Sequence, residues 1–102
     1  MHKRARALAV SAAVKRHVYE RDGGRCVLCG SIYGLPNAHY IGRAQGGLGI
    51  EKNVVTLCAD CHRAYDQTAE RAGIRDELRA YLMEHYPDWD ETELIYDKWR
   101  ET

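Results

Sequence analysis

Four cysteines constrain this chain more than any other feature, because they form two C-x-x-C pairs. The pairs are Cys26/Cys29 and Cys58/Cys61, with 28 residues between them and no cysteine left over. Four thiolates in two such knuckles converge tetrahedrally on one ion, an arrangement that Zn²⁺ prefers and that the spacing also allows for iron. A site filled by four sulfurs keeps no open position, so we expect a structural metal that clamps the two pairs together.

Two redox-active dithiols or a pair of disulfides are the alternatives for the same cysteines. The chain shows no thioredoxin-like βαβ pattern that would carry a redox pair. The basic N-terminus has no uninterrupted apolar region and no clear cleavage site, so we expect no signal peptide. We therefore expect a cytoplasmic, intracellular protein, in a reducing compartment where disulfides are rare.

The length and the charge pattern indicate one domain with a basic beginning and an acidic end. A chain of 102 residues is expected to form a single domain, and no run approaches the ~18 apolar residues of a membrane span. Residues 1–25 carry seven Lys and Arg against two acids, whereas residues 76–102 carry three against nine. The basic segment suits phosphate binding, and the acidic one would face away or toward a protein partner. Two solvated helix faces explain the same charges without a partner.

Local patterns predict the elements before and between the cysteine pairs. Ser11 is expected to cap a helix that runs to about Arg21. The expected inner face of this helix is made of Val14, Val18 and Tyr19. Two short strands are expected over residues 38–41 and 54–57, separated by a glycine-rich loop over residues 42–49.

The rest of the chain is predicted to be helical. A helix should begin near Asp60 and place His62 and Asp66, four residues apart, on one face. A longer helix should end before Pro87. The residues at helical spacing in it are Ile74, Leu78, Tyr81, Leu82 and His85. Asp90 begins a capping-box-like stretch that predicts a last helix. That last helix would bear Leu94, Ile95 and Trp99.

The segment inside the cysteine loop, NAHYIGRAQGGLGIEKNVVTLCADCH, carries a second pattern. It places His39 on an expected strand, Gly46-Gly47 in the loop, Asn53 fourteen residues after His39, and His62 nine residues later. This pattern resembles the HNH endonucleases of the ββα-metal group. The set RDGGRCVLCG, NAHYI, GGLGIEKN and CHRAYD is similar above all to small phage-type HNH proteins.

The resemblance implies an α+β fold with a ββα-metal (His-Me finger) core, stapled by a four-cysteine zinc site. An N-terminal helix would precede this core and two C-terminal helices would follow it. We expect one HNH nuclease domain over residues 1–102. Its parts would be a basic N-terminal helix at residues 1–25, the zinc-stapled core at 26–69 and a helical acidic extension at 70–102.

Phosphodiester hydrolysis needs an activated water, neutralised phosphate charge and a stabilised leaving oxygen. His39 is the expected general base, because imidazole titrates near neutral pH. The resemblance implies that Asn53 holds the catalytic loop and orients His39 through its amide. His62 is free of the zinc site and is expected to ligate Mg²⁺ or Mn²⁺, and Asp66, one turn later, adds a candidate oxygen ligand.

Ala38 departs from a common pattern of the family, in which a metal ligand stands immediately before the base. The catalytic ion would then be held by His62, with Asp66 and the Asn53 carbonyl as further candidates, plus water and phosphate. Tyr40 is expected in the core, because neighbouring residues of a strand point to opposite faces.

The resemblance implies a metal-dependent endonuclease that binds double-stranded DNA mostly through its backbone. Arg43, Lys52 and Arg63 flank the expected site and are the candidate phosphate contacts. The stretch from Lys3 to Arg6, together with Lys15 and Arg16, is expected to add nonspecific affinity. The resemblance further implies a phage or prophage protein that works beside DNA-packaging terminase and portal proteins. The sequence favours neither a monomer nor a dimer.

A zinc-stabilised nucleic-acid-binding or adaptor protein without catalysis is the alternative from a different class. The cysteines and the basic beginning would serve it equally well, but it gives no purpose to His39, Asn53 and His62 at this spacing. A restriction-type nuclease acting on modified DNA shares the chemistry, although 102 residues leave little room for a recognition domain.

Overall fold

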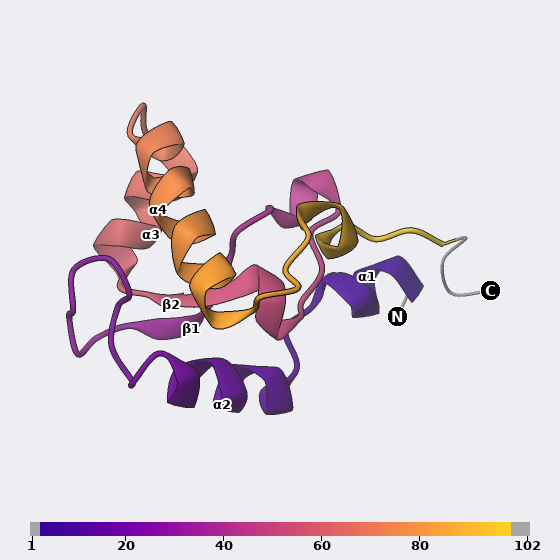
Figure 1. Ribbon diagram of the computed structural model, residues 1–102, viewed down its shortest axis with the longest axis horizontal. Coiled ribbons are helices and arrows are strands. Elements are labelled where there is room, and N and C mark those ends of the chain that lie inside the picture. The colour runs from indigo at the N-terminus through magenta and orange to yellow at the C-terminus, as the bar shows by residue number, and fades with distance from the viewer. Residues whose placement is uncertain (1–2, 99–102) are drawn as a thin grey trace.

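Two short antiparallel strands lie at the centre of the chain (Figure 1). The computed structural model describes residues 3–98 and has an α+β fold. The strands are β1 (Leu35–His39) and β2 (Val54–Leu57). Their facing residues are Leu35 with Leu57, Ala38 with Val55, and His39 with Val54. The bounds of β2 are confirmed, whereas β1 was predicted over residues 38–41 but begins at Leu35 and ends at His39.

The basic beginning of the chain forms two helices rather than the single helix expected over residues 1–25. α1 (Lys3–Leu8) and α2 (Ala12–Arg21) are separated by a turn in which Ser11 has an extended backbone. The Ser11 hydroxyl accepts the Val14 N–H at 3.1 Å, so the predicted cap is confirmed. This cap starts a new helix and explains why α1 does not continue into α2.

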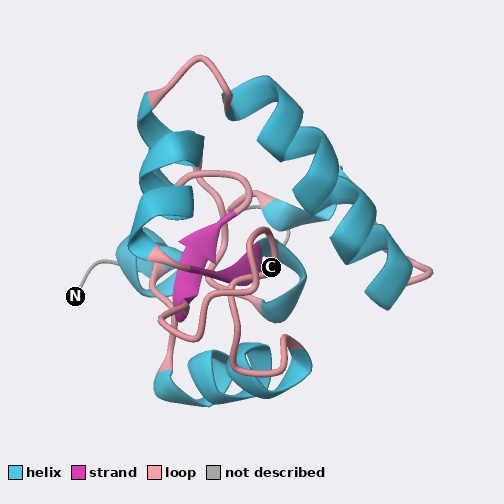
Figure 2. Cartoon of the chain, turned by 90° about the vertical axis from the view of Figure 1, so that its left-hand side faces the viewer, coloured by secondary structure: helices cyan, strands magenta, loops and turns pink. Residues whose placement is uncertain are grey.

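Helices cover the sheet on both sides. α2 lies on one side of the strands, and α3 (Ala59–Gln67) and α4 (Arg71–His85) lie on the other (Figures 1 and 2). Val18 is fully buried on the inner face of α2, but Tyr19 is 43% exposed, so its predicted place on that face was wrong. The predicted start of α3 is confirmed, and so is the end of the longer helix before Pro87.

The prediction of a last helix was wrong. After α4 the chain makes one 3₁₀ turn, η3 (Glu91–Leu94), and then extends. Asp90 caps this turn through its carboxylate. Ile95 then pairs with Gly47 as an isolated β-bridge, so backbone bonds to a distant loop replace those of a helix. Trp99, which was expected on that helix, lies outside the described residues.

The glycine-rich loop over residues 42–49 is held between both ends of the described chain. It contains the 3₁₀ turn η1 (Arg43–Gln45) and is followed by a second one, η2 (Glu51–Asn53). Toward the N-terminal side, the Gly49 N–H donates a hydrogen bond to the Ala7 carbonyl at 3.0 Å. Toward the C-terminal side, the Leu48 N–H donates to the Leu94 carbonyl and the Tyr96 N–H donates to the Gly46 carbonyl, both at 2.8 Å. A Cβ at Gly49 would lie 2.1 Å from the Ala9 carbonyl oxygen, so glycine is required there.

A buried ion pair, Arg21 with Asp22, lies among the apolar side chains of the core. The largest fully buried members of the core include Tyr40, Tyr65, Leu57, Leu78 and Leu82, so the predicted burial of Tyr40 is confirmed. Arg21 Nε donates to Asp22 Oδ1 at 2.7 Å, and the two side chains are 8% and 0% exposed. Asp22 also accepts the Thr56 N–H at 2.8 Å and the Tyr81 hydroxyl at 2.6 Å. This carboxylate therefore ties α2 to β2 and α4.

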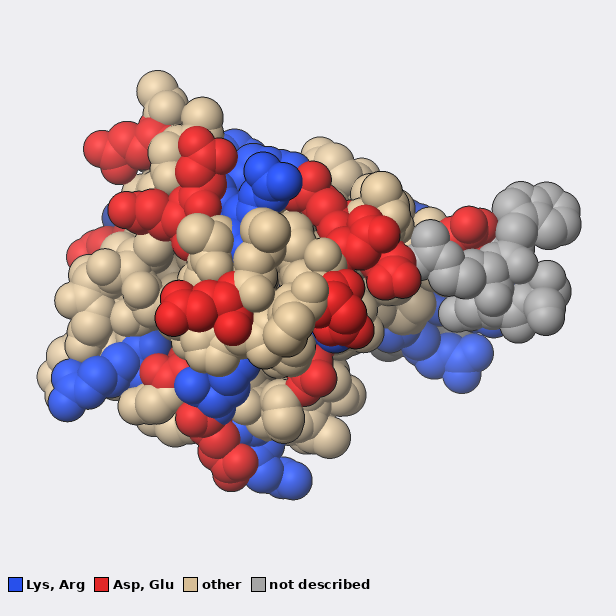
Figure 3. Space-filling model, viewed as in Figure 1, with Lys and Arg blue, Asp and Glu red and all other residues tan. Residues whose placement is uncertain are grey.

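Carboxylates are spread over α4 and η3 on the face seen in Figure 3, with Lys and Arg among them. These elements belong to the part of the chain where the sequence predicted an acidic excess. Within residues 3–98, no helix is long and apolar enough to cross a membrane.

Candidate functional site

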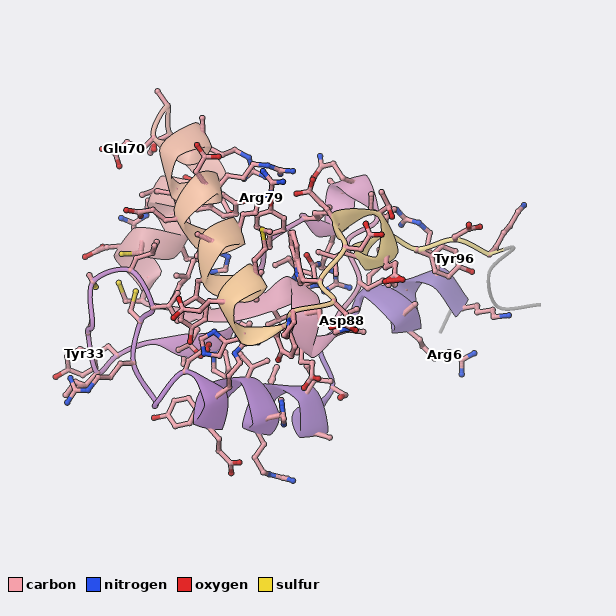
Figure 4. All side chains as sticks on the ribbon, viewed as in Figure 1. Arg6, Tyr33, Glu70, Arg79, Asp88 and Tyr96 are labelled. Carbon is pink, nitrogen blue, oxygen red and sulfur yellow. The ribbon has the colours of Figure 1, made fainter. Side chains whose placement is uncertain are left out.

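The four cysteines converge between the knuckle that follows α2 and the start of α3, and their sulfur atoms lie together in Figure 4. All four Sγ atoms lie within 4.8 Å of one another, and Cys29 Sγ is 3.6 Å from Cys58 Sγ. Sulfurs bound at ~2.3 Å to a tetrahedral zinc ion would be about 3.8 Å apart. The cysteines form no disulfide. This donor set therefore fits a structural metal such as zinc.

Backbone N–H groups on each side are directed at cysteine sulfurs. Gly30, with φ +79°, donates its N–H to the Cys26 carbonyl at 2.9 Å and closes the first knuckle. Cys58 is the N-cap of α3, and its Sγ accepts the Cys61 N–H at 3.5 Å. Burial raises the pKa of Cys26, but backbone N–H groups directed at its sulfur outweigh burial and lower it to about 7. Burial and the neighbouring thiols instead raise the pKa of Cys61. A backbone N–H at Ser31 lowers the pKa of Cys29, but the neighbouring thiols outweigh it and raise that pKa. The backbone therefore favours a thiolate at Cys26, and a metal that binds all four sulfurs would displace protons from the others.

A separate cleft of about 490 Å³ opens at the end of β1. It brings together four of the residues predicted for the active site, from β1, η1 and α3. The polar side chains that line it are Lys15, Asn37, His39, Arg43, His62 and Asp66. The residues around this cleft are therefore candidates for chemistry, whereas the cysteines are candidates for a structural metal.

His39 enters the cleft with one ring nitrogen already engaged. Its Nε2 lies 2.8 Å from the Leu8 carbonyl oxygen at the end of α1. A carbonyl only accepts, so Nε2 carries the proton and Nδ1 is the free acceptor of the neutral ring. Burial lowers the pKa of His39, the Leu8 carbonyl opposes this shift, and the charge of Arg43 lowers the pKa further. His39 is therefore neutral at pH 7.

His62 and Asp66 form a pair on one face of α3, as predicted. His62 Nε2 lies 3.0 Å from Asp66 Oδ2, and the side chains are 34% and 47% exposed. Arg71 Nη1 lies 3.9 Å from the other carboxylate oxygen of Asp66. An imidazole nitrogen and a carboxylate oxygen thus stand side by side at the surface of the cleft, and divalent ions accept both kinds of donor.

The cleft has two of these donors in contact but no third one beside them. Within the part of the chain that the structure describes, the cysteines are the only group of three or more metal-ligating side chains whose donor atoms converge. Ala38 is fully buried and adds no ligand. A divalent ion held by His62 and Asp66 would need water and phosphate oxygens for most of its ligands.

Asn53 lies behind the cleft and holds the glycine-rich loop. Its side chain is fully buried. Its Oδ1 accepts the Ile41 N–H at 2.8 Å, and its Nδ2 donates to the carbonyls of Ile41 at 3.1 Å and Leu48 at 2.8 Å. The amide thus joins the two ends of the loop and makes no direct bond to His39, contrary to the expected orienting contact. Its oxygen is buried and engaged, so it is not open to an ion.

Of the three predicted phosphate contacts, only Arg43 lines the cleft. Lys52 Nζ lies 2.9 Å from Asp88 Oδ2, in the segment that follows α4 (Figure 4). Arg63 is 62% exposed on α3 and lies 3.5 Å from Asp60 Oδ1. The structure therefore places Lys52 and Arg63 outside the candidate site.

Three groups of the cleft were missing from the predicted site. Asn37 was detectable, because it lies two residues before His39 on a strand and so shares its face. Lys15 was expected to add only general affinity, and the structure places it in the cleft itself. The contact of the Leu8 carbonyl with His39 had no sequence signal, since it depends on how the chain turns over residues 9–11.

The chain matches no model of a protein family, and a comparison with curated proteins finds no significant match. The resemblance to HNH endonucleases therefore rests on the quoted motifs, of which His39 and His62 line the cleft and Asn53 does not.

Proposed function

We propose that this chain is a metal-dependent endonuclease of the HNH type, which hydrolyses phosphodiester bonds in double-stranded DNA. The shared cleft carries the proposal: His39 at the end of a strand faces the same space as the His62–Asp66 pair on the following helix. Arg43 lines the same space. The chain order of strand, glycine-rich loop, strand and helix agrees with a ββα-metal core.

His39 supplies the general base in this proposal. Because its Nε2–H is directed at the Leu8 carbonyl, Nδ1 is the atom that accepts the proton of the attacking water. The lowered pKa keeps this nitrogen unprotonated at neutral pH. A positioned base of this kind contributes ~10²–10⁴-fold to the rate.

The groups opposite His39 address the phosphate. Arg43 brings a positive charge to the cleft and neutralises a phosphate oxygen. His62 and Asp66 are the residues that would hold a divalent ion. When bound, Mg²⁺ or Mn²⁺ supplies Lewis-acid activation of the phosphate and stabilises the leaving oxygen.

The cysteine site acts on this chemistry through position. His62 follows Cys61 directly in the first turn of α3, so a metal on the cysteines fixes the start of the helix that carries His62. One peptide bond thus joins Cys61, a proposed ligand of the structural metal, to His62 of the proposed active site. The resemblance extends the proposal to a phage or prophage protein that acts beside terminase and portal proteins.

The test follows the relaxation of supercoiled plasmid by zinc-loaded protein in Mg²⁺ or Mn²⁺. We expect nicking that needs the divalent ion and falls by at least ~10²-fold in His39→Ala. His85→Ala is the matched control, because His85 also contacts a backbone carbonyl, that of Tyr81 at 2.9 Å, but lies on α4 and outside the cleft. Circular dichroism verifies that both variants are folded.

Two results would contradict the proposal. Cleavage that persists in folded His39→Ala would remove His39 as the base, and cleavage without a divalent ion would remove the metal mechanism. A wild-type protein that binds zinc and DNA but cuts nothing in any divalent ion would favour the adaptor alternative.

A further inference from the structure

We propose that Lys15 and Asn37 form a second phosphate subsite, which binds the phosphodiester next to the scissile one on the same DNA strand. The inference rests on the proposed function, since it takes His39, His62 and Arg43 as the scissile site. It assigns a ligand to two cleft residues that the scissile chemistry does not use.

The position of Lys15 is the first support. In Figure 1, α2 lies below the strands and the turn that carries Arg43 lies above them. Lys15 on α2 and Arg43 on η1 nevertheless line one cleft, together with His39. Two positive charges from different elements therefore reach the cleft that also holds the proposed general base. A DNA strand that crosses this cleft can meet both cations.

The position of Asn37 is the second support. Asn37 and His39 lie two residues apart on β1 and both line the cleft, whereas Ala38 between them is fully buried. Asn37 is exposed. Its side chain has no hydrogen-bond partner among the described residues. An exposed amide nitrogen in the same cleft as a lysine offers two N–H donors to a phosphate oxygen.

The charge balance of the cleft favours an anion at this position. Asp66 is the single acid among the described residues that line the cleft, and it already contacts His62 at 3.0 Å and Arg71 at 3.9 Å. No ion pair is present for Lys15 within residues 3–98. An ammonium and an amide donor in one cleft suit a singly charged phosphodiester, and neither group binds a cation.

The experiment measures binding of the zinc-loaded protein to a short fluorescein-labelled DNA duplex by anisotropy, without Mg²⁺ or Mn²⁺, over a range of salt concentrations. Loss of one phosphate contact lowers the slope of log K against log salt by about 0.9. We expect this loss in Lys15→Gln. Arg16→Gln is the matched control, because it removes one charge from the same helix at a residue that does not line the cleft.

Asn37→Ala should weaken binding without changing the salt slope, since an amide releases no counterion. A second duplex carries one neutral methylphosphonate beside the bond that cleavage assays identify as the cut one. The wild type should bind this duplex more weakly than the unmodified duplex, whereas Lys15→Gln should bind the two duplexes equally. This second measurement separates a neighbouring phosphate from general attraction to DNA.

The subsite is overturned if Lys15→Gln keeps the wild-type slope, or if Arg16→Gln lowers it equally. Insensitivity of the wild type to methylphosphonates on both sides of the cut bond overturns it as well. The anisotropy result does not depend on catalysis. A slope change in a protein that cuts no DNA would therefore keep the subsite and remove the nuclease, and cleavage with an unchanged slope would do the opposite.

Discussion

Gly49→Ala tests how firmly the end of α1 is held against the candidate cleft. A Cβ at this position would lie 2.1 Å from the Ala9 carbonyl oxygen, 2.5 Å from the Ala9 carbonyl carbon and 2.9 Å from the Leu8 carbonyl oxygen. All three are backbone atoms, so no side-chain rotation relieves the contact. The turn between α1 and α2 must move, and this turn carries the carbonyl that His39 contacts.

The expected cost follows from the bonds that depend on this turn. Gly49 N–H donates to the Ala7 carbonyl at 3.0 Å, and His39 Nε2 lies 2.8 Å from the Leu8 carbonyl oxygen. A hydrogen bond contributes ~0.5–1.5 kcal/mol net, so loss of both lowers the free energy of unfolding by about 1–3 kcal/mol. A change of ~1 kcal/mol shifts Tm by about 4–8 °C in a domain near this size. We therefore expect a drop of at least about 4 °C.

Thermal melts of zinc-loaded protein, followed by circular dichroism, measure this drop. Gly73→Ala is the matched control, because Gly73 lies inside α4 and a Cβ there meets nothing within 4 Å. This control should gain about 0.5–1 kcal/mol, since alanine is the better helix former. Plasmid cleavage well below Tm should also slow in Gly49→Ala, because His39 loses the carbonyl that fixes its tautomer. A Gly49→Ala protein with wild-type Tm and wild-type cleavage would refute the reasoning.

Three further predictions address the core, the metal centre and the base. Asp22→Ala leaves the Arg21 guanidinium buried without its partner and should cost ~3–5 kcal/mol in urea unfolding; an unchanged midpoint would show that the pair is dispensable. Removal of the metal by a chelator should release one zinc ion per chain and lower Tm, and a metal-free chain that melts like the loaded one contradicts a structural role. Burial lowers the pKa of His39 in the folded chain below the value of about 6.5 that a histidine has in the unfolded chain. As the pH falls past about 6.5, the unfolded chain therefore binds a proton at His39 before the folded chain does. The stability present above that pH should be lost, along with activity, as the pH falls through the folded pKa. Urea midpoints of wild type and His39→Gln between neutral and mildly acidic pH measure this, and identical pH dependence in the two would contradict it.

Local patterns were sufficient for the elements that are set by nearby residues. The Ser11 cap, the bounds of β2 and the start of α3 follow from side chains within a few positions of each element. The prediction of a last helix was wrong because the Ile95 backbone pairs with Gly47, which is distant in the sequence. β1 was placed too late because Tyr40 is as buried as a strand residue although it lies beyond the end of the strand.

The sequence by itself predicted the cysteine cluster that fits a structural metal, because C-x-x-C spacing brings the two cysteines of each pair together within a single turn. Only the approach of the two pairs to each other depended on the fold. The sequence also placed His62 and Asp66 together, since their spacing is that of one helix face. Only the tertiary structure decided what surrounds His39. The Leu8 carbonyl contacts His39 and Lys15 lines the same cleft, both from helices more than twenty residues away, while Lys52 is held elsewhere by Asp88. Such contacts depend on how all the layers of the chain pack, and no local spacing encodes them.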